Sequence, residues 1–422
     1  MVPVFVLDPA LIATSGGPRL AFLYRTLRAL NASLDGNLVV RSGDPAVEIP
    51  ALVAELGVEE VHVTRDFGPY GRDRDQRVAQ KLAGMGARLV GHGSPYAVAP
   101  GVVRKGDGQP YAVFTPFFRA WQRELTVATP ANIPVRWHDT VNIACDALPT
   151  EPPIGCQLPA ASEDAAHEQL DRFLTTALDR YPDQRDLPAI GGTSGLSPYL
   201  RWGVLHPHQL LIHLGDSVAH QLFRSELAWR DFYADVLHHH PASARRNLQS
   251  KMDAMDVDSD DAARARFDLW CHGRTGFPIV DAGMRQLLAT GWMHNRVRMI
   301  VASFLVKDLH LPWQWGARHF MQHLVDGDLA SNQHGWQWAA GTGTDAAPYF
   351  RVFNPVTQSE RFDRDGTYIR RWVPELVAVT GKAIHAPWLC PTGLPEGAQE
   401  PMVDHALERD VALSRYQRAM GR

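Results

Sequence analysis

The stretch DGDLASNQHGWQWAAGTGTDAAPYFR, residues 326–351, brings together the polar and aromatic side chains of a candidate site. These side chains belong to Asp326, Asp328, Asn332, Trp336, Trp338, Asp345 and Arg351. The Gly and Ala residues between them leave room for a flat ligand to approach the backbone closely. An aromatic core segment with solvated carboxylates is the alternative interpretation. The many small residues favour a ligand site.

Two other segments place polar side chains beside apolar ones at helical spacing. In GWMHNRVRM, Asn295 and Met299 lie one helical turn apart and therefore project from one face. In ELAWRDFY, Glu226 and Trp229 share a helical face for the same reason.

Together these three segments closely resemble the photolyase and cryptochrome family, most nearly its class I cyclobutane pyrimidine dimer photolyases. The resemblance runs from about residue 3 to about residue 390. It implies a flavoprotein that binds FAD and acts on UV-damaged DNA. In the implied reaction, light drives an electron from reduced, anionic FAD to a pyrimidine dimer and the cyclobutane ring splits. We therefore expect a carbon–carbon lyase of the deoxyribodipyrimidine photo-lyase type.

Length, charge and cysteine content restrict the class of protein. A chain of 422 residues can bury a large core and should hold two domains. The formal net charge of -4 means that any contact with nucleic acid must come from a local basic patch. The four cysteines are scattered and form no C-x-x-C pair, which fits a reducing cytoplasm. The opening MVPVFVLDPAL lacks a basic leader, and no run is long enough to span a bilayer. We expect a cytoplasmic protein of bacterial type that associates with the nucleoid when bound to DNA, and no membrane partner.

Residues 1–130 alternate short β-branched runs with amphipathic helical patterns, which predicts an α/β domain with a doubly wound parallel sheet. The predicted strands are Val4–Leu7, Leu38–Arg41, Val61–Thr64 and Arg88–Val90. Apolar residues at helical spacing predict helices over 20–30, 47–56 and 78–83. No G-x-G-x-x-G follows the first run, so the domain lacks the standard dinucleotide fingerprint.

The resemblance also indicates what this domain lacks. Family members open with a strand and an Arg-Asp-Leu-Arg loop, and neither precedes Val4 in this sequence. Without that first strand, the pocket for an antenna chromophore lacks one wall. The stretch FGPYGRDRD, residues 67–75, resembles the deazaflavin-type branch more than the folate-type branch, although a solvated helix start explains its charges equally well. We expect stoichiometric FAD and little of a deazaflavin-type antenna.

The rest of the chain is predicted to form a linker and a larger helical domain. Residues 131–180 are predicted to form the interdomain linker and a first helix, and residues 181–422 an all-helical catalytic domain that binds FAD. Ten of the twelve tryptophans lie between Trp202 and Trp388, inside this domain. The segment GGTSGLSPYLRWG predicts a helix at 198–203, whose free N-terminal amides favour phosphate oxygens.

The resemblance assigns the FAD contacts residue by residue. Those implied for the diphosphate and ribityl part are Tyr181, Thr193, Ser194, Gly195, Leu196 and Ser197. Those implied for the adenosine ribose and the isoalloxazine are Arg298, Asp326, Gly327, Asp328 and Asn332. Arg298 is expected to pair with Asp326, and Asn332 is expected to face the flavin N5. The family often has a basic residue where this chain has Gly195.

The resemblance also assigns contacts with the dimer and with DNA. Glu226 is expected to hydrogen-bond the dimer bases with help from Asn295, while Trp229 and Trp338 form apolar walls and Met299 packs nearby. A dimer flipped out of the stack is expected, because the flavin cannot reach it inside the duplex. The expected phosphate contacts are Arg185, Arg230, Arg296 and Arg351.

Family members commonly pass electrons to the excited flavin along three tryptophans. Trp336 matches the member next to FAD, and Trp313 matches the middle one. The outer member is missing, because Val257 stands where the tryptophan would be and valine cannot be oxidised at an accessible potential. Trp315 or a nearby tyrosine is the expected replacement, although a packing role explains Trp315 equally well.

Three other functions share parts of this pattern. A cryptochrome-like blue-light photoreceptor has the same fold and cofactor but usually departs from the dimer-repair residues. A 6-4 photoproduct lyase is expected to place His where this chain has Asn295 and Met299. A flavoprotein without photochemistry is the third alternative. The run His238–His240 lacks a partner at ligand spacing, so we expect no metal, and we expect a monomer.

Overall fold

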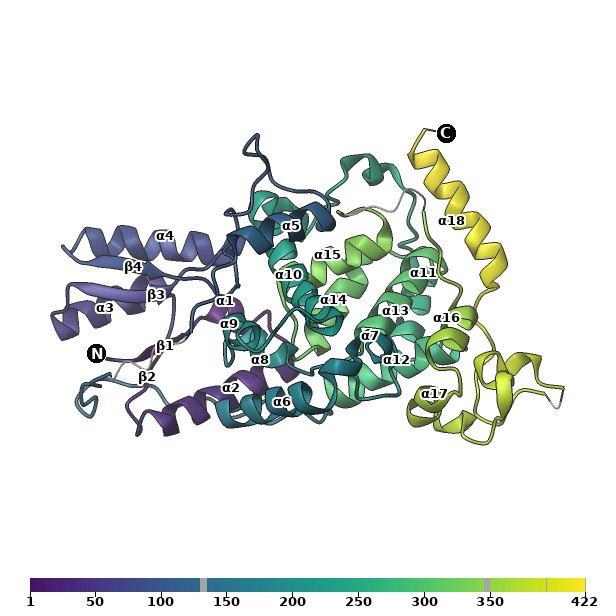
Figure 1. Ribbon diagram of the computed structural model, residues 1–422, viewed down its shortest axis with the longest axis horizontal. Helices are drawn as coiled ribbons and strands as arrows, with labels where there is room; N and C mark the ends of the chain where they lie inside the picture. The colour runs from purple at the N-terminus through teal and green to yellow at the C-terminus, as the bar shows by residue number, and fades with distance from the viewer. Residues whose placement is uncertain (130–134, 345–349, 392, 422) are drawn as a thin grey trace. The chain divides into compact units, whose positions relative to one another are not determined.

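The computed structural model describes residues 1–129, 135–344, 350–391 and 393–421. Asp345 and part of the predicted linker lie outside these ranges. The chain divides into two compact units (Figure 1). Unit 1 comprises Met1–Ile154, Pro159–Leu174 and Gly195–Pro241, and unit 2 comprises Gly155–Leu158, Thr175–Ser194 and Ala242–Arg422.

Unit 1 contains all the strands of the described chain and several helices. Its strands are β1 (Val4–Leu7), β2 (Val39–Ser42), β3 (Glu60–Thr64) and β4 (Arg88–His92). Its helices are α1 (Pro9–Ile12), α2 (Gly17–Ser33), α3 (Pro45–Leu56), α4 (Pro69–Ala83), α5 (Phe114–Glu124), most of α6 (Glu163–Thr176), α8 (Ser197–Trp202), α9 (Pro207–Leu211) and α10 (Val218–His239). The predicted strands and the helices between them are confirmed.

The strands form two separate parallel pairs instead of the single sheet expected from the sequence. β1 pairs with β2 in the register Val4 to Val39, and β3 pairs with β4 in the register Glu60 to Arg88. Among the described residues, no strand joins β1 to β3. The sheet therefore stays divided between these two strands.

Helices cover both faces of the β1–β2 pair, as a doubly wound arrangement requires. Phe5 and Leu7 pack against Tyr24 and Leu27 of α2 on one face. Val4 and Val39 pack with Leu52 and Leu56 of α3 on the other face. The α/β character predicted for the N-terminal part of the chain is thus confirmed.

Unit 2 is helical, as predicted. Its elements are η1 (Leu178–Arg180), α7 (Tyr181–Gln184), η3 (Ser250–Ala254), α11 (Asp261–Cys271), α12 (Pro278–Thr290), α13 (Asn295–Lys307), α14 (Trp313–His323), α15 (Leu329–Ala340), α16 (Pro355–Phe362), α17 (Thr367–Trp372), η4 (Pro374–Leu376), η5 (Gly381–His385), η6 (Pro387–Leu389) and α18 (His405–Ala419), while η2 (Pro241–Ala244) begins at its boundary. No helix in the described part of the chain is long and apolar enough to cross a bilayer.

The core of unit 2 forms where α12 and α13 approach each other closely. A Cβ added at Gly283 of α12 would lie 2.4 Å from Val297 of α13, so only glycine allows this distance. Val280, Val301 and Leu305 are fully buried beside this contact. The close packing fixes α13, the helix that carries several of the predicted site residues.

The start of α13 is set by a histidine cap. His294 Nδ1 accepts a hydrogen bond of 3.1 Å from the Arg296 N–H, so this nitrogen carries no proton. His294 is only 2% exposed. Burial lowers the pKa of His294 from 6.5 to about 4.

We expect the protein to lose stability relative to the variant His294→Asn as the pH falls from 6.5 to about 4. In this window the unfolded imidazole binds a proton that the folded one does not, so stability falls with falling pH. The loss approaches about 3 kcal/mol, whereas asparagine keeps the cap and does not titrate. Urea unfolding of both proteins across this range measures the difference. A difference that stays constant with pH would contradict the assignment.

Candidate functional site

An ion pair between a half-buried arginine and a buried aspartate joins α13 to the turn before α15. Arg298 Nη2 donates to both carboxylate oxygens of Asp326, at 3.1 and 2.8 Å, and Arg298 Nε donates to the Met293 carbonyl at 2.8 Å. Asp326 is 7% exposed. The predicted pairing of Arg298 with Asp326 is therefore present, and it holds a negative charge at a fixed place.

Asp328 immediately precedes α15, and Asn332 lies in its first turn. Asp328 caps the helix, because its Oδ1 accepts from the Ser331 N–H at 2.8 Å. Asn332 is buried, and its amide nitrogen donates to the Ala317 carbonyl at 3.0 Å and to Gln333 at 2.9 Å. Because the amide hydrogens are committed to the protein, Asn332 Oδ1 is the atom that can accept a hydrogen bond from a ligand. A reduced flavin carries such a donor at N5.

Trp336 lies deep in the same helix. Its side chain is 2% exposed and packs over Gly316 of α14, where an added Cβ would lie 2.1 Å from the indole. Its Nε1 is buried and has no hydrogen-bond partner among the described residues. The close contact with Gly316 fixes the position of Trp336.

Trp313 begins α14, one helical turn before Gly316. It is 4% exposed, and its Nε1 donates to Asn247 Oδ1 at 2.9 Å.

The Trp336 ring contacts two other aromatic rings, those of Phe320 at 5.0 Å and Trp270 at 6.0 Å between centroids. The sequence interpretation missed Trp270. Its spacing from the apolar and aromatic residues of α11 signalled burial, but nothing local indicated that it lies beside Trp336.

Three of the predicted dimer contacts lie in unit 2. Asn295 is exposed at the first position of α13, and Met299 follows one turn later, so the predicted common face is present. Met299 Sδ accepts a hydrogen bond of 3.7 Å from Arg296. Trp338 is half-buried with its ring centroid 6.5 Å from that of Phe353.

The other two predicted dimer contacts, Glu226 and Trp229, lie on α10 in unit 1, again on one helical face. The Trp229 ring stacks on Phe114 with centroids 3.7 Å apart and planes 9° apart. This contact covers one face of the indole and fixes its orientation. Phe232 meets the same indole in an edge contact at 5.6 Å.

The chain passes from unit 2 to unit 1 within the segment that is predicted to bind the diphosphate. Tyr181, Thr193 and Ser194 belong to unit 2, whereas Gly195, Leu196 and Ser197 belong to unit 1. The predicted helix is α8, which begins at Ser197. Gly195 has a φ of +64°, a conformation that a side chain strains. The backbone therefore favours the glycine that stands where the family often has a basic residue.

The predicted DNA-binding arginines differ in the hydrogen bonds, ring contacts and ion pairs that they make within the protein. Arg230 donates to the Pro95 and Leu200 carbonyls at 2.8 and 3.2 Å, and its guanidinium lies 4.5 Å from the Tyr96 ring. A second arginine, Arg296, pairs with Asp186 at 2.9 Å.

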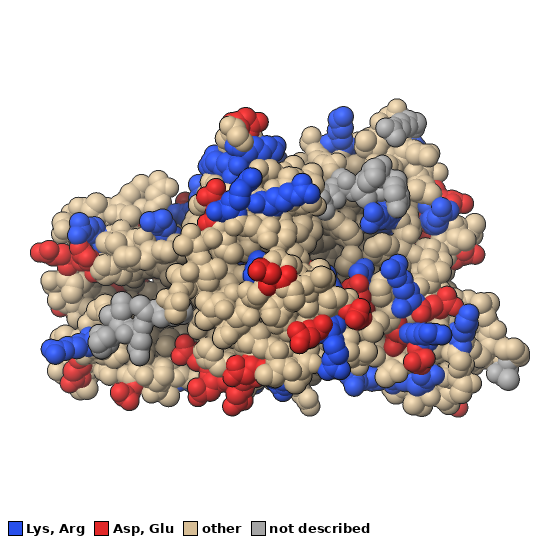
Figure 2. All heavy atoms as spheres, in the orientation of Figure 1, with Lys and Arg blue, Asp and Glu red and all other residues tan. Residues whose placement is uncertain are grey.

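The remaining two arginines lie in unit 2. Arg185 lies over the Tyr181 ring at 5.4 Å, and Arg351 is exposed. In Figure 2, basic and acidic side chains both appear on the surface shown, among larger areas of other residues, in agreement with the small net charge. Any basic surface for DNA is therefore a local one.

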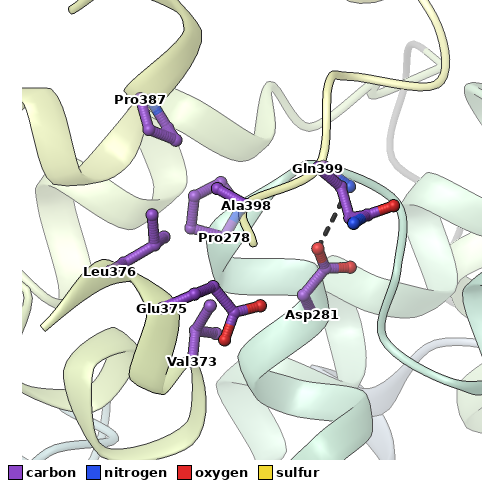
Figure 3. Close-up of a pocket in the computed structure, with 9 residues that line it drawn as sticks. Pro278, Asp281, Val373, Glu375, Leu376, Pro387, Ala398 and Gln399 are labelled. Atoms are coloured by element: carbon purple, nitrogen blue, oxygen red, sulfur yellow. Dashed lines mark hydrogen bonds between the residues drawn. The ribbon is translucent and has the colours of Figure 1, made fainter. Parts of the chain in front are cut away.

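A small recess lies elsewhere in unit 2 (Figure 3). Its lining includes Pro278, Asp281 and Glu375, and none of the predicted site residues lines it. Asp281 accepts hydrogen bonds from the Thr275 N–H and hydroxyl, both at 2.7 Å, and from the Gly276 N–H at 3.0 Å. Because Glu375 pairs with Arg285 at 2.7 Å, the charged groups here serve the fold.

We expect the variant Arg298→Ala to lower the thermal midpoint and the FAD content of the purified protein. Removing the guanidinium takes away the two hydrogen bonds that tie the Asp326 carboxylate to α13, and the loss of hydrogen bonds to a charged group typically costs about 1.5–3 kcal/mol. The control Arg298→Lys keeps the charge but loses the planar guanidinium, and we expect an intermediate loss. Thermal unfolding and flavin absorbance per chain measure both effects. A variant Arg298→Ala that keeps its midpoint and its flavin would contradict this role.

Comparison with known protein families gives two matches along the chain. A family described as the FAD binding domain of DNA photolyase matches residues 223–418, and the DNA photolyase family matches residues 1–135. The deoxyribodipyrimidine photo-lyase of Vibrio cholerae is 42% identical over an alignment that covers 96% of this chain and 88% of the relative. For the enzyme of the same name in Escherichia coli the identity is 40%, with 94% and 89% covered.

Solved structures agree with these matches. A bacterial class III photolyase from Agrobacterium tumefaciens superposes with a TM-score of 0.87 and 35% identity, and it covers 100% of this chain and 92% of its own. A cryptochrome from Synechocystis superposes with a TM-score of 0.88 and 27% identity, over 97% of this chain and 92% of its own. Sequence and fold therefore agree along nearly the whole length, and the chain belongs to the DNA photolyase family.

Proposed function

We propose that this protein splits cyclobutane pyrimidine dimers in DNA under blue light, with reduced FAD as its cofactor. The observation that carries the proposal is the agreement, along 96% of the chain, with a relative named deoxyribodipyrimidine photo-lyase. We further propose that it acts as a monomer in a reducing cytoplasm, a compartment that suits its free cysteines.

The residues of unit 2 fit a bound FAD. The Arg298–Asp326 pair supplies fixed charges, and Asn332 Oδ1 offers an acceptor for the N5–H of the reduced ring. Fixed charges of this kind stabilise charge displacement without reorganisation during the reaction. When bound, reduced FAD supplies the electron on excitation by light. Asp328 would contact the cofactor from the start of α15, where it also caps the helix.

The proposed dimer contacts come from three helices: α10 carries Glu226 and Trp229, α13 carries Asn295 and Met299, and α15 carries Trp338. Glu226 would hydrogen-bond the dimer bases, and Asn295, exposed at the start of α13, would assist it. Trp229 and Trp338 would form apolar walls, with Met299 packed nearby. Because Phe114 covers one face of the Trp229 indole, its orientation is set before DNA binds. The Trp229 side chain therefore loses less conformational entropy when DNA binds.

A cryptochrome-like photoreceptor is the alternative that the Synechocystis superposition supports. That likeness rests on the shared fold at 27% identity. Asn295 and Met299, at the positions where a 6-4 photoproduct lyase is expected to have histidines, favour dimer repair. Repair of a defined lesion in the test tube separates the three functions.

We expect Glu226→Ala to lower the yield of dimer repair under blue light while FAD stays bound. The alanine removes the hydrogen bond to the dimer bases, and losing one hydrogen bond to a charged group typically costs about 1.5–3 kcal/mol. Repair of an oligonucleotide with one thymine dimer, in light and in darkness, measures the effect. Glu226→Gln keeps the shape and is the matched control. Full repair by the alanine variant would rule out the assigned role of Glu226.

Electron supply to the flavin follows a route in which the outer tryptophan is replaced. Val257 is 49% exposed, as an outer position requires, but valine cannot be oxidised in its place. A second aromatic path leaves Trp336 through Trp270, which stacks on Phe267 at 5.8 Å. Phe267 in turn meets Trp315 at 5.4 Å. Phenylalanine, like valine, is not oxidised at an accessible potential, so Phe267 separates Trp270 from Trp315 and is not itself a donor. These contacts support Trp315 as the replacement donor.

We expect photoreduction of oxidised FAD to be slower than in a protein with three matched tryptophans, and Val257→Trp to speed it. Repair by enzyme that is already reduced should not change, because it needs no electron from the surface. Transient absorption of the flavin after a light pulse measures the rate. The variants Trp313→Phe and Trp270→Phe show which of the two paths carries the electron. If neither variant slows photoreduction and Val257→Trp does not speed it, the proposed path is wrong.

A further inference from the structure

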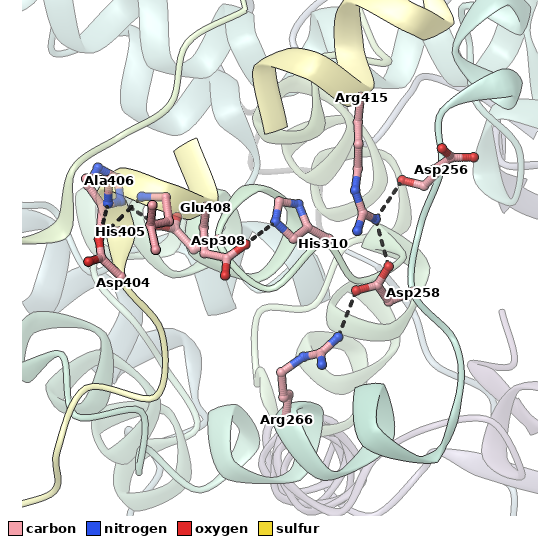
Figure 4. Close-up of polar contacts among 11 residues, drawn as sticks. Asp256, Asp258, Arg266, Asp308, His310, Asp404, His405, Ala406, Glu408 and Arg415 are labelled. Carbon is pink, nitrogen blue, oxygen red and sulfur yellow. Dashed lines mark hydrogen bonds and ion pairs between the residues drawn. The ribbon is translucent and has the colours of Figure 1, made fainter. Parts of the chain in front are cut away.

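The last helix, α18, is held to unit 2 mainly by polar contacts (Figure 4). His405 Nδ1 lies 2.5 Å from Asp308 Oδ1, and Glu408 Oε2 lies 2.7 Å from His310 Nε2. Ala412 is the single buried residue of this fully described helix. Directional contacts therefore define where α18 lies.

A third anchor holds the far end of α18. Arg415 donates to Asp258 Oδ1 at 2.7 Å, and Arg266 of α11 donates to Asp258 Oδ2 at 2.8 Å. Asp258 thus connects two helices, and its N–H donates to the His310 carbonyl at 2.9 Å. The three anchors fix both ends of α18 and with them the side chain one residue after Arg415.

That side chain is Tyr416, which stacks on Phe350. The two ring centroids are 4.5 Å apart and the planes differ by 13°. The Lys307 Nζ lies 4.3 Å from the centroid of the same Phe350 ring. A Cβ added at Gly341, the residue that ends α15, would lie 3.1 Å from Phe350. Phe350 is therefore held by groups from three parts of unit 2.

Lys307 also holds the next residue, because its Nζ donates to the Arg351 carbonyl. Lys307 is 4% exposed, whereas Arg351 is exposed. Burial lowers the pKa of Lys307 to about 7, and both the ammonium and the amine can donate to this carbonyl. The backbone of Arg351 is thus fixed from inside while its side chain reaches the surface.

We propose that α18 positions Arg351 for contact with a DNA phosphate, and that Tyr416 acts through Phe350. The inference rests on the proposed function, in which Arg351 contacts DNA. A guanidinium on a fixed backbone loses less conformational freedom when it binds a phosphate than one on a loose segment. Tyr416 is therefore a positioning residue for damaged-DNA binding and takes no part in ring splitting.

The test compares Tyr416→Ala with Tyr416→Phe in the FAD-loaded protein. The probe is a duplex oligonucleotide with one thymine dimer, and its dissociation constant is measured over a range of salt concentrations. We expect Tyr416→Ala to weaken binding roughly three- to tenfold, the range expected for one aromatic pair. The slope of log affinity against log salt should fall by up to about one, because one phosphate contact is loosened. Tyr416→Phe keeps the stack and should bind as the wild type does.

Two controls separate positioning from a general loss of structure. Leu407→Ala changes a side chain of α18 that is 66% exposed, and it should leave affinity and salt slope unchanged. Repair yield per bound dimer should be the same in all these variants. A Tyr416→Ala protein with wild-type affinity and salt slope would overturn the inference. So would a Tyr416→Phe protein that binds as weakly as Tyr416→Ala.

A double variant tests whether Tyr416 acts through Arg351. In the background Arg351→Ala, adding Tyr416→Ala should weaken binding no further, because the two changes remove the same contact. Additive losses would overturn the route through Arg351. If Arg351→Ala alone leaves affinity unchanged, both this inference and the DNA contact of Arg351 are wrong. Light-dependent repair by the unmodified protein decides the proposed function separately.

Discussion

The pair of Arg298 and Asp326 is the interaction on which the arrangement of unit 2 depends most. It joins α13 to the turn that starts α15, and these two helices carry Asn295, Met299 and Asn332. Burying the Asp326 carboxylate costs free energy, which the close approach of the half-buried Arg298 guanidinium and its further bond to the Met293 carbonyl offset. Such a pair adds little net stability but strongly disfavours any other register of the two helices.

A steric constraint reinforces this electrostatic one. α15 lies close to α14 because Gly316 leaves room for the Trp336 indole, and α13 lies close to α12 because Gly283 leaves room for Val297. Glycines at helix contacts let two backbones approach, but they weaken each helix by about 1 kcal/mol relative to alanine. Both glycines stand where an aromatic or branched side chain needs the space. The candidate site is therefore built from helices whose close contact depends on these two glycines.

The sequence predicted local elements better than long-range pairing. β-branched runs such as Val4–Leu7 identified the strands, because a strand's pattern is local. The division between β1 and β3 could not be read from either run alone, because pairing between strands depends on residues far apart in the sequence. The same holds for Trp270, since its place beside Trp336 is set by packing between residues 66 positions apart in the printed sequence. Arg298 and Asp326 were paired correctly, but only through the family resemblance.

The divided sheet has a consequence for how unit 1 opens. The two strand pairs share one covering helix: α2 packs on β1–β2, α4 packs on β3–β4, and α3 packs on both. The inner edges of β1 and β3 carry backbone amides that no described strand protects. Amide hydrogen exchange is fastest where such edges open locally. Unpaired edges also act as templates for other chains. We therefore expect amide hydrogen exchange in unit 1 to be fastest at the unpaired edges of β1 and β3. Self-association of unit 1 should begin at the same edges.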